Sequence, residues 1–165
     1  MENVWFKQRG TGRRFIIKVG PGADLIQVLL DFAQSQELPF ASTVSAVGSV
    51  RNVEIASILA GAHLPMTEAR FKVTRLEGPL ELMGLEGNIA ANPDGRLGGQ
   101  FHLVASRSNG DVVGGRLLKA EVFTPCEIVL AEYLVHGIRR HTSVTTGVDT
   151  IYINDPGEGG LPCKP

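Results

Sequence analysis

Gln100 and His102 are polar residues whose side chains could bind a ligand, and they lie close together in the sequence. They stand two positions apart in a strand-like segment, so a strand would place both side chains on one face. Arg116 follows after the turn sequence Asn109-Gly110 and can lie beside His102 in one hairpin register. Arginine binds carboxylates through two parallel hydrogen bonds. These three residues are therefore a candidate site for a small anion or carboxylate.

The register of this hairpin decides whether Arg116 joins the cluster. A two-residue Asn109-Gly110 turn would place Arg116 opposite Leu103, on the other face. A three-residue loop from Ser108 to Gly110 would place it opposite His102. Glycine at the last loop position suits the left-handed conformation that three-residue loops need, which favours the second register.

Arg116 also has a structural interpretation, which we favour from the sequence alone. It would then form an ion pair with Glu81, or with a carboxylate across a subunit contact. Glu81 is kept as a fourth candidate site residue, although a buried hydrogen-bond acceptor fits it better. His63 is expected in a loop, and the segment His136–His141 is expected to be a solvated turn rather than a phosphate contact.

The sequence offers little support for an enzyme. It contains no glycine-rich phosphate loop with its lysine, no nucleophile elbow and no metalloprotease helix. Lys and Arg number 16 against 17 Asp and Glu, so the net charge is −1, which argues against strong direct binding to nucleic acid. Cys126 and Cys163 form no metal or redox motif. No signal peptide or membrane-spanning segment is recognised, so we expect a cytoplasmic protein.

The elements that must position the candidate residues are mostly strands. One helix is predicted from Ala23 to Gln36, where apolar residues follow a helical period opposite a polar stripe. Strands are predicted over residues 14–19, 43–50, 52–59, 70–76, 80–89, 99–106, 112–118, 127–134 and 146–153. The pattern favours an α+β fold with a largely antiparallel sheet and one main packed helix. We expect a single domain over residues 1–154 and a mobile tail over residues 155–165.

Glycine is frequent, at 20 of 165 residues, and nine of these fall between Gly78 and Gly115. Asp94-Gly95 and Asn109-Gly110 predict two similar hairpin turns. The glycines inside strands indicate bulges or places where another backbone approaches closely.

Several of these segments resemble motifs of the PPC domain, which plants and prokaryotes share. The resembling segments are Ser45–Val53 (the family's SA-G-S---V strand), Gly78–Met83 (its GRFEIL hexapeptide), Leu85–Gly87 (its LSG) and Asn109–Gly115 (its DGRVVGG hairpin). The resemblance covers Phe15 to Ile153. It implies a compact α+β fold and a homotrimer, with the glycine-rich strands near subunit contacts and with protein partners.

Plant members of this family carry AT-hook motifs that bind the minor groove of DNA, and bacterial members are labelled DNA-binding through this relation. The present sequence lacks the Arg-Gly-Arg-Pro core, and Gly12-Arg13-Arg14 is too short to replace it. The resemblance therefore implies a trimeric assembly module of unknown biochemical role, associated with DNA or regulation through partners, with weak or absent direct DNA binding. A small-molecule site around His102 and Arg116 is the alternative.

Many bacterial and archaeal members of the family also hold a metal with three histidines. The resemblance is what singles out the corresponding positions here, Gln100, His102 and Arg116, so only one histidine is kept. Convergence of the three family ligands also favours the register that places Arg116 opposite His102. A guanidinium does not lose its proton and cannot replace an imidazole ligand. We therefore expect no metal and no other cofactor.

Overall fold

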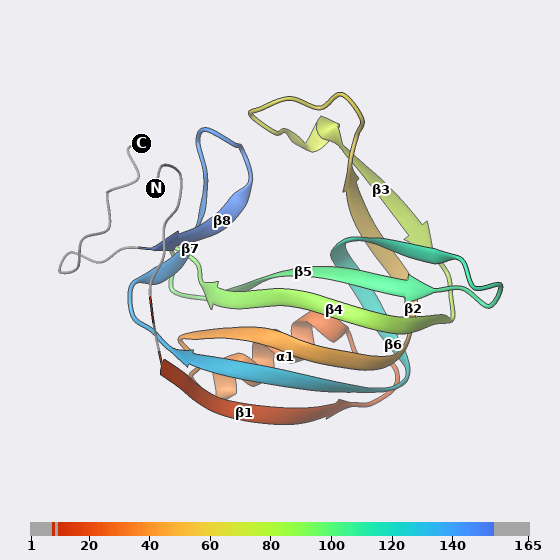
Figure 1. The fold of residues 1–165 in the computed structure, drawn as a ribbon, viewed down its shortest axis with the longest axis horizontal. Helices are drawn as coiled ribbons and strands as arrows, with labels where there is room; N and C mark the ends of the chain where they lie inside the picture. Colours follow the sequence, from red (N-terminus) through yellow and green to blue (C-terminus); the bar gives the residue numbers. More distant parts are fainter. Residues whose placement is uncertain (1–7, 9, 154–165) are drawn as a thin grey trace.

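The computed structural model describes residues 8 and 10–153, and within them the chain forms eight strands and one α-helix (Figure 1). The elements are β1 (Gly10–Val19), α1 (Leu25–Ser35), β2 (Phe40–Ile58), a short 3-10 helix η1 (Glu68–Arg70), β3 (Phe71–Leu76), β4 (Leu80–Ala91), β5 (Leu97–Ser106), β6 (Val112–Leu134), β7 (Ile138–Thr142) and β8 (Asp149–Ile153). The predicted antiparallel sheet with one packed helix is confirmed, although the fold is richer in β-structure than the α+β class implies.

The strands form one sheet that partly closes on itself. Its order is β3-β2-β6-β5-β4-β7-β8, with β1 paired to β6, and β2 also pairs with β4. The strands β2, β6, β5 and β4 therefore make a ring. The pairings are antiparallel except for one parallel bridge, Ala91 to Arg139, between β4 and β7.

The helix begins at a side-chain cap and buries one face. The carboxylate of Asp24 accepts a hydrogen bond of 3.0 Å from the backbone amide of Gln27, which satisfies a donor at the helix start. Leu25, Leu29 and Ala33 are fully buried at helical spacing, and the helix packs against β5 and β6. The predicted helix is confirmed, with ends one or two residues inside the expected range.

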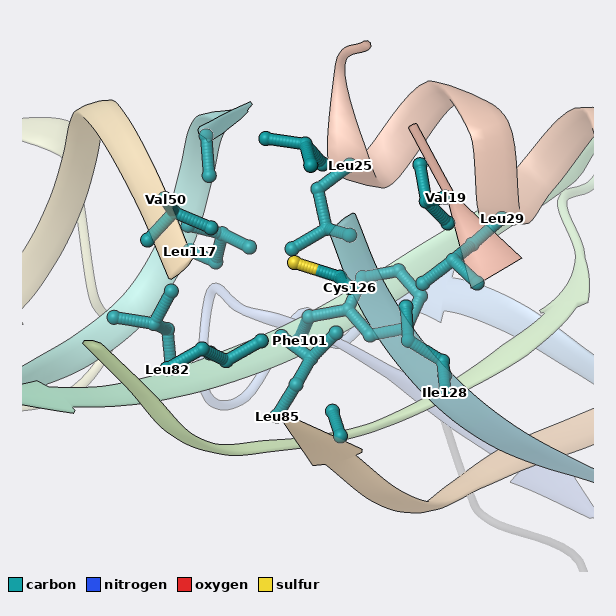
Figure 2. Close-up of a cluster of buried hydrophobic side chains, with 14 of the residues drawn as sticks. Val19, Leu25, Leu29, Val50, Leu82, Leu85, Phe101, Leu117, Cys126 and Ile128 are labelled. Carbon is teal, nitrogen blue, oxygen red and sulfur yellow. The ribbon is translucent and has the colours of Figure 1, made fainter. Parts of the chain in front are cut away.

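Cys126 lies at the centre of the core (Figure 2). It is fully buried among apolar side chains such as Leu25, Val50 and Phe101, and burial raises the pKa of its thiol. A Cβ on Gly48 would lie 2.7 Å from the Cys126 sulfur, which explains why the Ser45–Val53 segment needs glycine there. Cys163 and the predicted tail over residues 155–165 lie outside the described residues.

Two expectations about individual elements are wrong. β2 and β6 are each continuous where the sequence indicated two separate strands, because irregular pairing between them lets long strands bend without breaking. The segment His136–His141 is not a solvated turn, since most of it forms β7, which pairs with β8. In residues 8 and 10–153, none of the helical structure is long and apolar enough to cross a membrane.

Two hairpins project on the same side of the ring (Figure 1). One is β7–β8, and the other joins β2 to β3 through η1. Their tips meet, because the Met66 amide donates a 2.7 Å hydrogen bond to the Thr146 carbonyl. A Cβ on Gly147 would lie 2.2 Å from the Met66 carbonyl oxygen, so glycine is required at this contact.

Candidate functional site

The hairpin β5–β6 has the register that brings Arg116 opposite His102. Arg107 and Asp111 close a three-residue loop, in which the Arg107 amide donates to the Asp111 carbonyl at 2.8 Å. Gly110 ends this loop with a φ of +87°, a conformation that favours glycine. The three-residue loop favoured by the sequence is therefore confirmed.

The β4–β5 turn has the same construction. The Asn92 amide donates to the Arg96 carbonyl at 2.8 Å, and Gly95 has a φ of +85°. The two hairpins are similar, as the sequence predicted.

A cavity of about 340 Å³ lies where β5 and β6 meet the β7–β8 hairpin. The polar side chains that line it are Asn92, Gln100, Arg116, Arg140 and Asp149. Its volume is at the lower end of the range of about 300–1,000 Å³ for small-molecule sites. The cavity is therefore large enough for a small metabolite.

Arg116 lines this cavity and carries a buried donor. Its Nε atom is buried and has no hydrogen-bond partner among the described residues. The guanidinium carbon lies 4.8 Å from the centre of the Phe71 ring, a cation–π contact that holds the group in place. A buried donor without a partner costs about 1–3 kcal/mol, which a bound acceptor would recover.

Arg140 is a buried cation that also lines the cavity, with a residue exposure of only 5%. Its Nε donates to the Gly98 carbonyl at 3.1 Å, its Nη1 to Gln100 Oε1 at 3.3 Å and its Nη2 to the Asn88 carbonyl at 2.9 Å. Nη2 also donates to the side-chain oxygen of Asn88. Burial lowers the pKa of Arg140, and the nearby charge of Asp149 opposes that shift.

Neutral oxygens thus hold Arg140 in place. Within residues 8 and 10–153 it forms no ion pair with a carboxylate, so its charge remains available to the cavity.

Gln100 is oriented by Arg140. Because its Oε1 accepts from the guanidinium, the Nε2 amide is the end that can donate to a ligand. The cavity thus presents the guanidinium of Arg116, the amide of Gln100 and the charge of Arg140. Such a set of donors suits an anion, above all a carboxylate or another planar oxyanion.

The other two predicted site residues do not line the cavity. His102 is exposed on the outer face of β5, between Glu86 of β4 and Arg116 of β6 in the pairing register. Glu81 is exposed on β4, in register with Ser106, so its expected role as a buried acceptor is wrong. Among the described residues Glu81 forms no ion pair with Arg116.

Sequence reasoning missed Arg140 and Asp149. Arg140 belongs to a segment that was expected to be a turn. The signal that could have found it is the pair of short runs 138–142 and 149–153, which contain β-branched residues and are separated by a turn with Gly147.

The residues at the three positions of the family's histidine site form a poor set of metal ligands. The positions that bear histidine in metal-binding relatives hold an amide, an imidazole and a guanidinium whose buried Nε is already protonated. The second cation, Arg140, adds further positive charge beside them. In the part of the chain that the structure describes, no group of three His, Cys, Asp or Glu side chains is placed to hold a metal ion.

Over the described residues, the fold and cavity define a β-rich domain with one α-helix, whose candidate ligand site includes a glycine-rich hairpin. Residues 6–134 match the Plants and Prokaryotes Conserved domain, abbreviated PCC or PPC. The chain belongs to this family, which confirms the resemblance seen in the sequence.

Several solved structures and curated proteins are similar to this chain. A PPC protein from Pyrococcus horikoshii is 26% identical, with a TM-score of 0.74 over 86% of this chain and 92% of its own. A metal-containing protein from Archaeoglobus fulgidus is 25% identical, with a TM-score of 0.76 over 88% and 96%. Two curated Synechococcus proteins named Bifunctional protein GlmU are 30% and 29% identical over 154 and 158 residues. These matches cover 93% and 94% of this chain, which spans 22% of the length of each GlmU protein.

A more distant structure shares the fold alone. It is named "Putative DNA-binding protein", comes from Ralstonia eutropha and is 16% identical, with a TM-score of 0.71 over 84% of this chain and 90% of its own.

Proposed function

We propose that this domain binds a small anion, most simply a carboxylate, in the cavity between β5, β6 and the β7–β8 hairpin. The observation that carries the proposal is the buried Nε of Arg116, which has no partner among the described residues. A carboxylate would accept from this atom and from the Gln100 amide. The buried charge of Arg140 would further stabilise it.

The test is a titration followed by amide NMR, with sodium pentanoate and inorganic phosphate as separate probes. Binding should shift the resonances of Gln100, Arg116 and Arg140, and Arg116→Met should weaken it at least about tenfold, because it removes a charged donor. Arg107→Met is the matched control, since this exposed arginine lies in the distant β5–β6 turn. Shifts that are absent at high millimolar probe, or equal in both variants, would refute the site.

A second role, assembly into a homotrimer, is favoured by apolar side chains on the same outer face. Val104 and Val112 are 44% and 59% exposed, and they share this face of the β5–β6 hairpin with His102. Met83 of the neighbouring β4 is 59% exposed. Exposed apolar patches mark protein contacts, so we infer that copies of the chain associate here.

Sedimentation velocity at micromolar concentration tests the assembly. A trimer should be found, and Val104→Asp should shift it toward the monomer because a charge would be buried at the contact. Val144→Asp is the control, at an exposed valine outside the β5–β6 hairpin. A wild-type protein that sediments as a monomer would rule out this role.

We further propose a cytoplasmic, regulatory protein that reaches DNA only through partners, with no direct contact with a membrane. The net charge of −1 supports this, because phosphate binding needs a basic surface. A gel-shift assay at low salt should show no complex with duplex DNA. A complex that weakens steeply with salt would overturn the proposal.

A further inference from the structure

Asp149 places a carboxylate on the wall of a cavity that otherwise suits anions. It is the first residue of β8, is exposed, and accepts a 2.6 Å hydrogen bond from the Thr142 hydroxyl through Oδ1. No described cation forms an ion pair with it, although its charge is felt by Arg140. Asp149 therefore retains acceptor capacity toward the cavity.

Charges of both signs thus line one small space. Arg116 and Arg140 supply two positive charges and Asp149 supplies one negative charge. A simple anion would gain from the arginines and would be repelled by Asp149. A ligand that bears a cation at its other end would turn the repulsion into an attraction.

We propose that the cavity selects a ligand with both a carboxylate and an amine, a compound of the amino acid class. This inference rests on the proposed anion site and specifies its ligand. The carboxylate binds the guanidinium of Arg116 and the amide of Gln100. The ammonium group donates to the carboxylate of Asp149, and the volume of about 340 Å³ suits a molecule of this size.

The experiment compares four probes of similar length: L-norvaline, 5-aminopentanoate, pentanoate and pentylamine. Isothermal titration with the full chain should show at least one amino acid binding about tenfold more tightly than pentanoate, as expected for one added charged hydrogen bond. L-norvaline and 5-aminopentanoate differ in the distance between the ammonium and the carboxylate, so the pair tests two spacings of these groups. Pentylamine should bind most weakly, because the two arginines repel it.

Asp149→Asn gives the sharpest test because its two effects have opposite signs. The amide keeps an oxygen that can accept from Thr142, so the hairpin should stay folded, which a melting curve checks. The variant should bind the preferred amino acid about tenfold more weakly and pentanoate severalfold more tightly. Asp111→Asn, in the distant turn, is the matched control and should change neither.

The outcomes separate this inference from the site on which it rests. If pentanoate binds through Arg116 but neither amino acid binds more tightly, the ligand class is wrong and the anion site stands. The same conclusion follows if Asp149→Asn strengthens every carboxylate alike. If no probe shows binding that depends on Arg116, the anion site itself is refuted. Pentylamine binding as tightly as the amino acids would also overturn the inference.

Discussion

Arg140 of β7 and Gln100 of β5 are joined by a hydrogen bond of 3.3 Å from the guanidinium Nη1 to the amide Oε1. The bond links the last hairpin of the described chain to the glycine-rich sheet. It also orients the Gln100 side chain, whose Nε2 donor is left for another partner. This one contact therefore links the stability of the β7–β8 hairpin to the orientation of a side chain that lines the proposed anion cavity.

Arg140→Met should loosen the β7–β8 hairpin and weaken anion binding. It removes four hydrogen bonds to Gly98, Gln100 and Asn88, so we expect a loss of roughly 2–4 kcal/mol of unfolding free energy. Hydrogen exchange over residues 138–153 should accelerate. Arg139→Met, at the exposed neighbour on the same strand, is the control. Equal exchange rates in the two variants would show that the Arg140 hydrogen bonds do not hold the β7–β8 hairpin against the sheet.

Gly87→Ala should destabilise the sheet while Gly84→Ala should not. A Cβ on Gly87 would lie 2.3 Å from the backbone oxygen of Gln100, whereas a Cβ on Gly84, in the same strand, would meet nothing within 4 Å. We expect a loss of about 1–3 kcal/mol for the first variant and less than about 0.5 kcal/mol for the second. Urea unfolding measures the stability of both variants. Similar midpoints would show that β4 and β5 can move apart at Gly87 with little loss of stability.

The stability of the β1 end should depend on pH through Glu132. Arg13 donates to this buried carboxylate from its backbone amide and from Nε, both at 2.9 Å, and from Nη2 at 3.1 Å. The Arg13 side chain is the main cause that holds the pKa of Glu132 below its ordinary value, followed by the backbone hydrogen bond.

A carboxyl with a lowered pKa stabilises the fold above its unfolded pKa of about 4.3, and this contribution is lost as the pH falls through the folded pKa. Thermal melting between pH 7 and pH 3 should therefore decline more steeply for the wild type than for Glu132→Gln. Other paired carboxylates titrate in both proteins, so the difference between the curves is the informative quantity. Parallel curves would assign the acid sensitivity to other groups.

Restoring the histidines of the metal-binding relatives should create a zinc site. Gln100→His with Arg116→His would place three imidazoles around one cross-strand pair, because His102 lies opposite residue 116. Equilibrium dialysis with metal analysis should find about one Zn²⁺ per chain in the double variant and none in the wild type. Arg116→His alone is the control. Stoichiometric zinc on the wild type would show that the guanidinium does not prevent binding.

The local features of this fold could be predicted from the sequence. The helical period and Asp24 located α1, and a single glycine at position 110 indicated the hairpin register that brings Arg116 opposite His102. Each of these signals is set by neighbouring residues. Together with the family resemblance, they predicted that Gln100 and Arg116 lie on one face of the hairpin, whereas the cavity that both line was not predicted.

The features that depend on distant partners could not be predicted in this way. The run Ile138–Thr142 contains two adjacent arginines, and it forms a strand because β8 pairs with it and because Arg140 finds neutral acceptors on β4 and β5. The continuity of β2 and β6 likewise depends on irregular pairing between residues far apart in the chain. Asp149 reaches the cavity only as a consequence of the same hairpin.

The hydrogen bond between Met66 and Thr146 has a mechanical consequence. It joins the loop before β3 to the β7–β8 hairpin. The loop leads to Phe71, whose ring contacts Arg116, and the hairpin carries Arg140. If a ligand that fills the proposed cavity strengthens the contact between the two tips, thermodynamic reciprocity requires that separating the tips lowers the affinity of the cavity for that ligand by the same free energy.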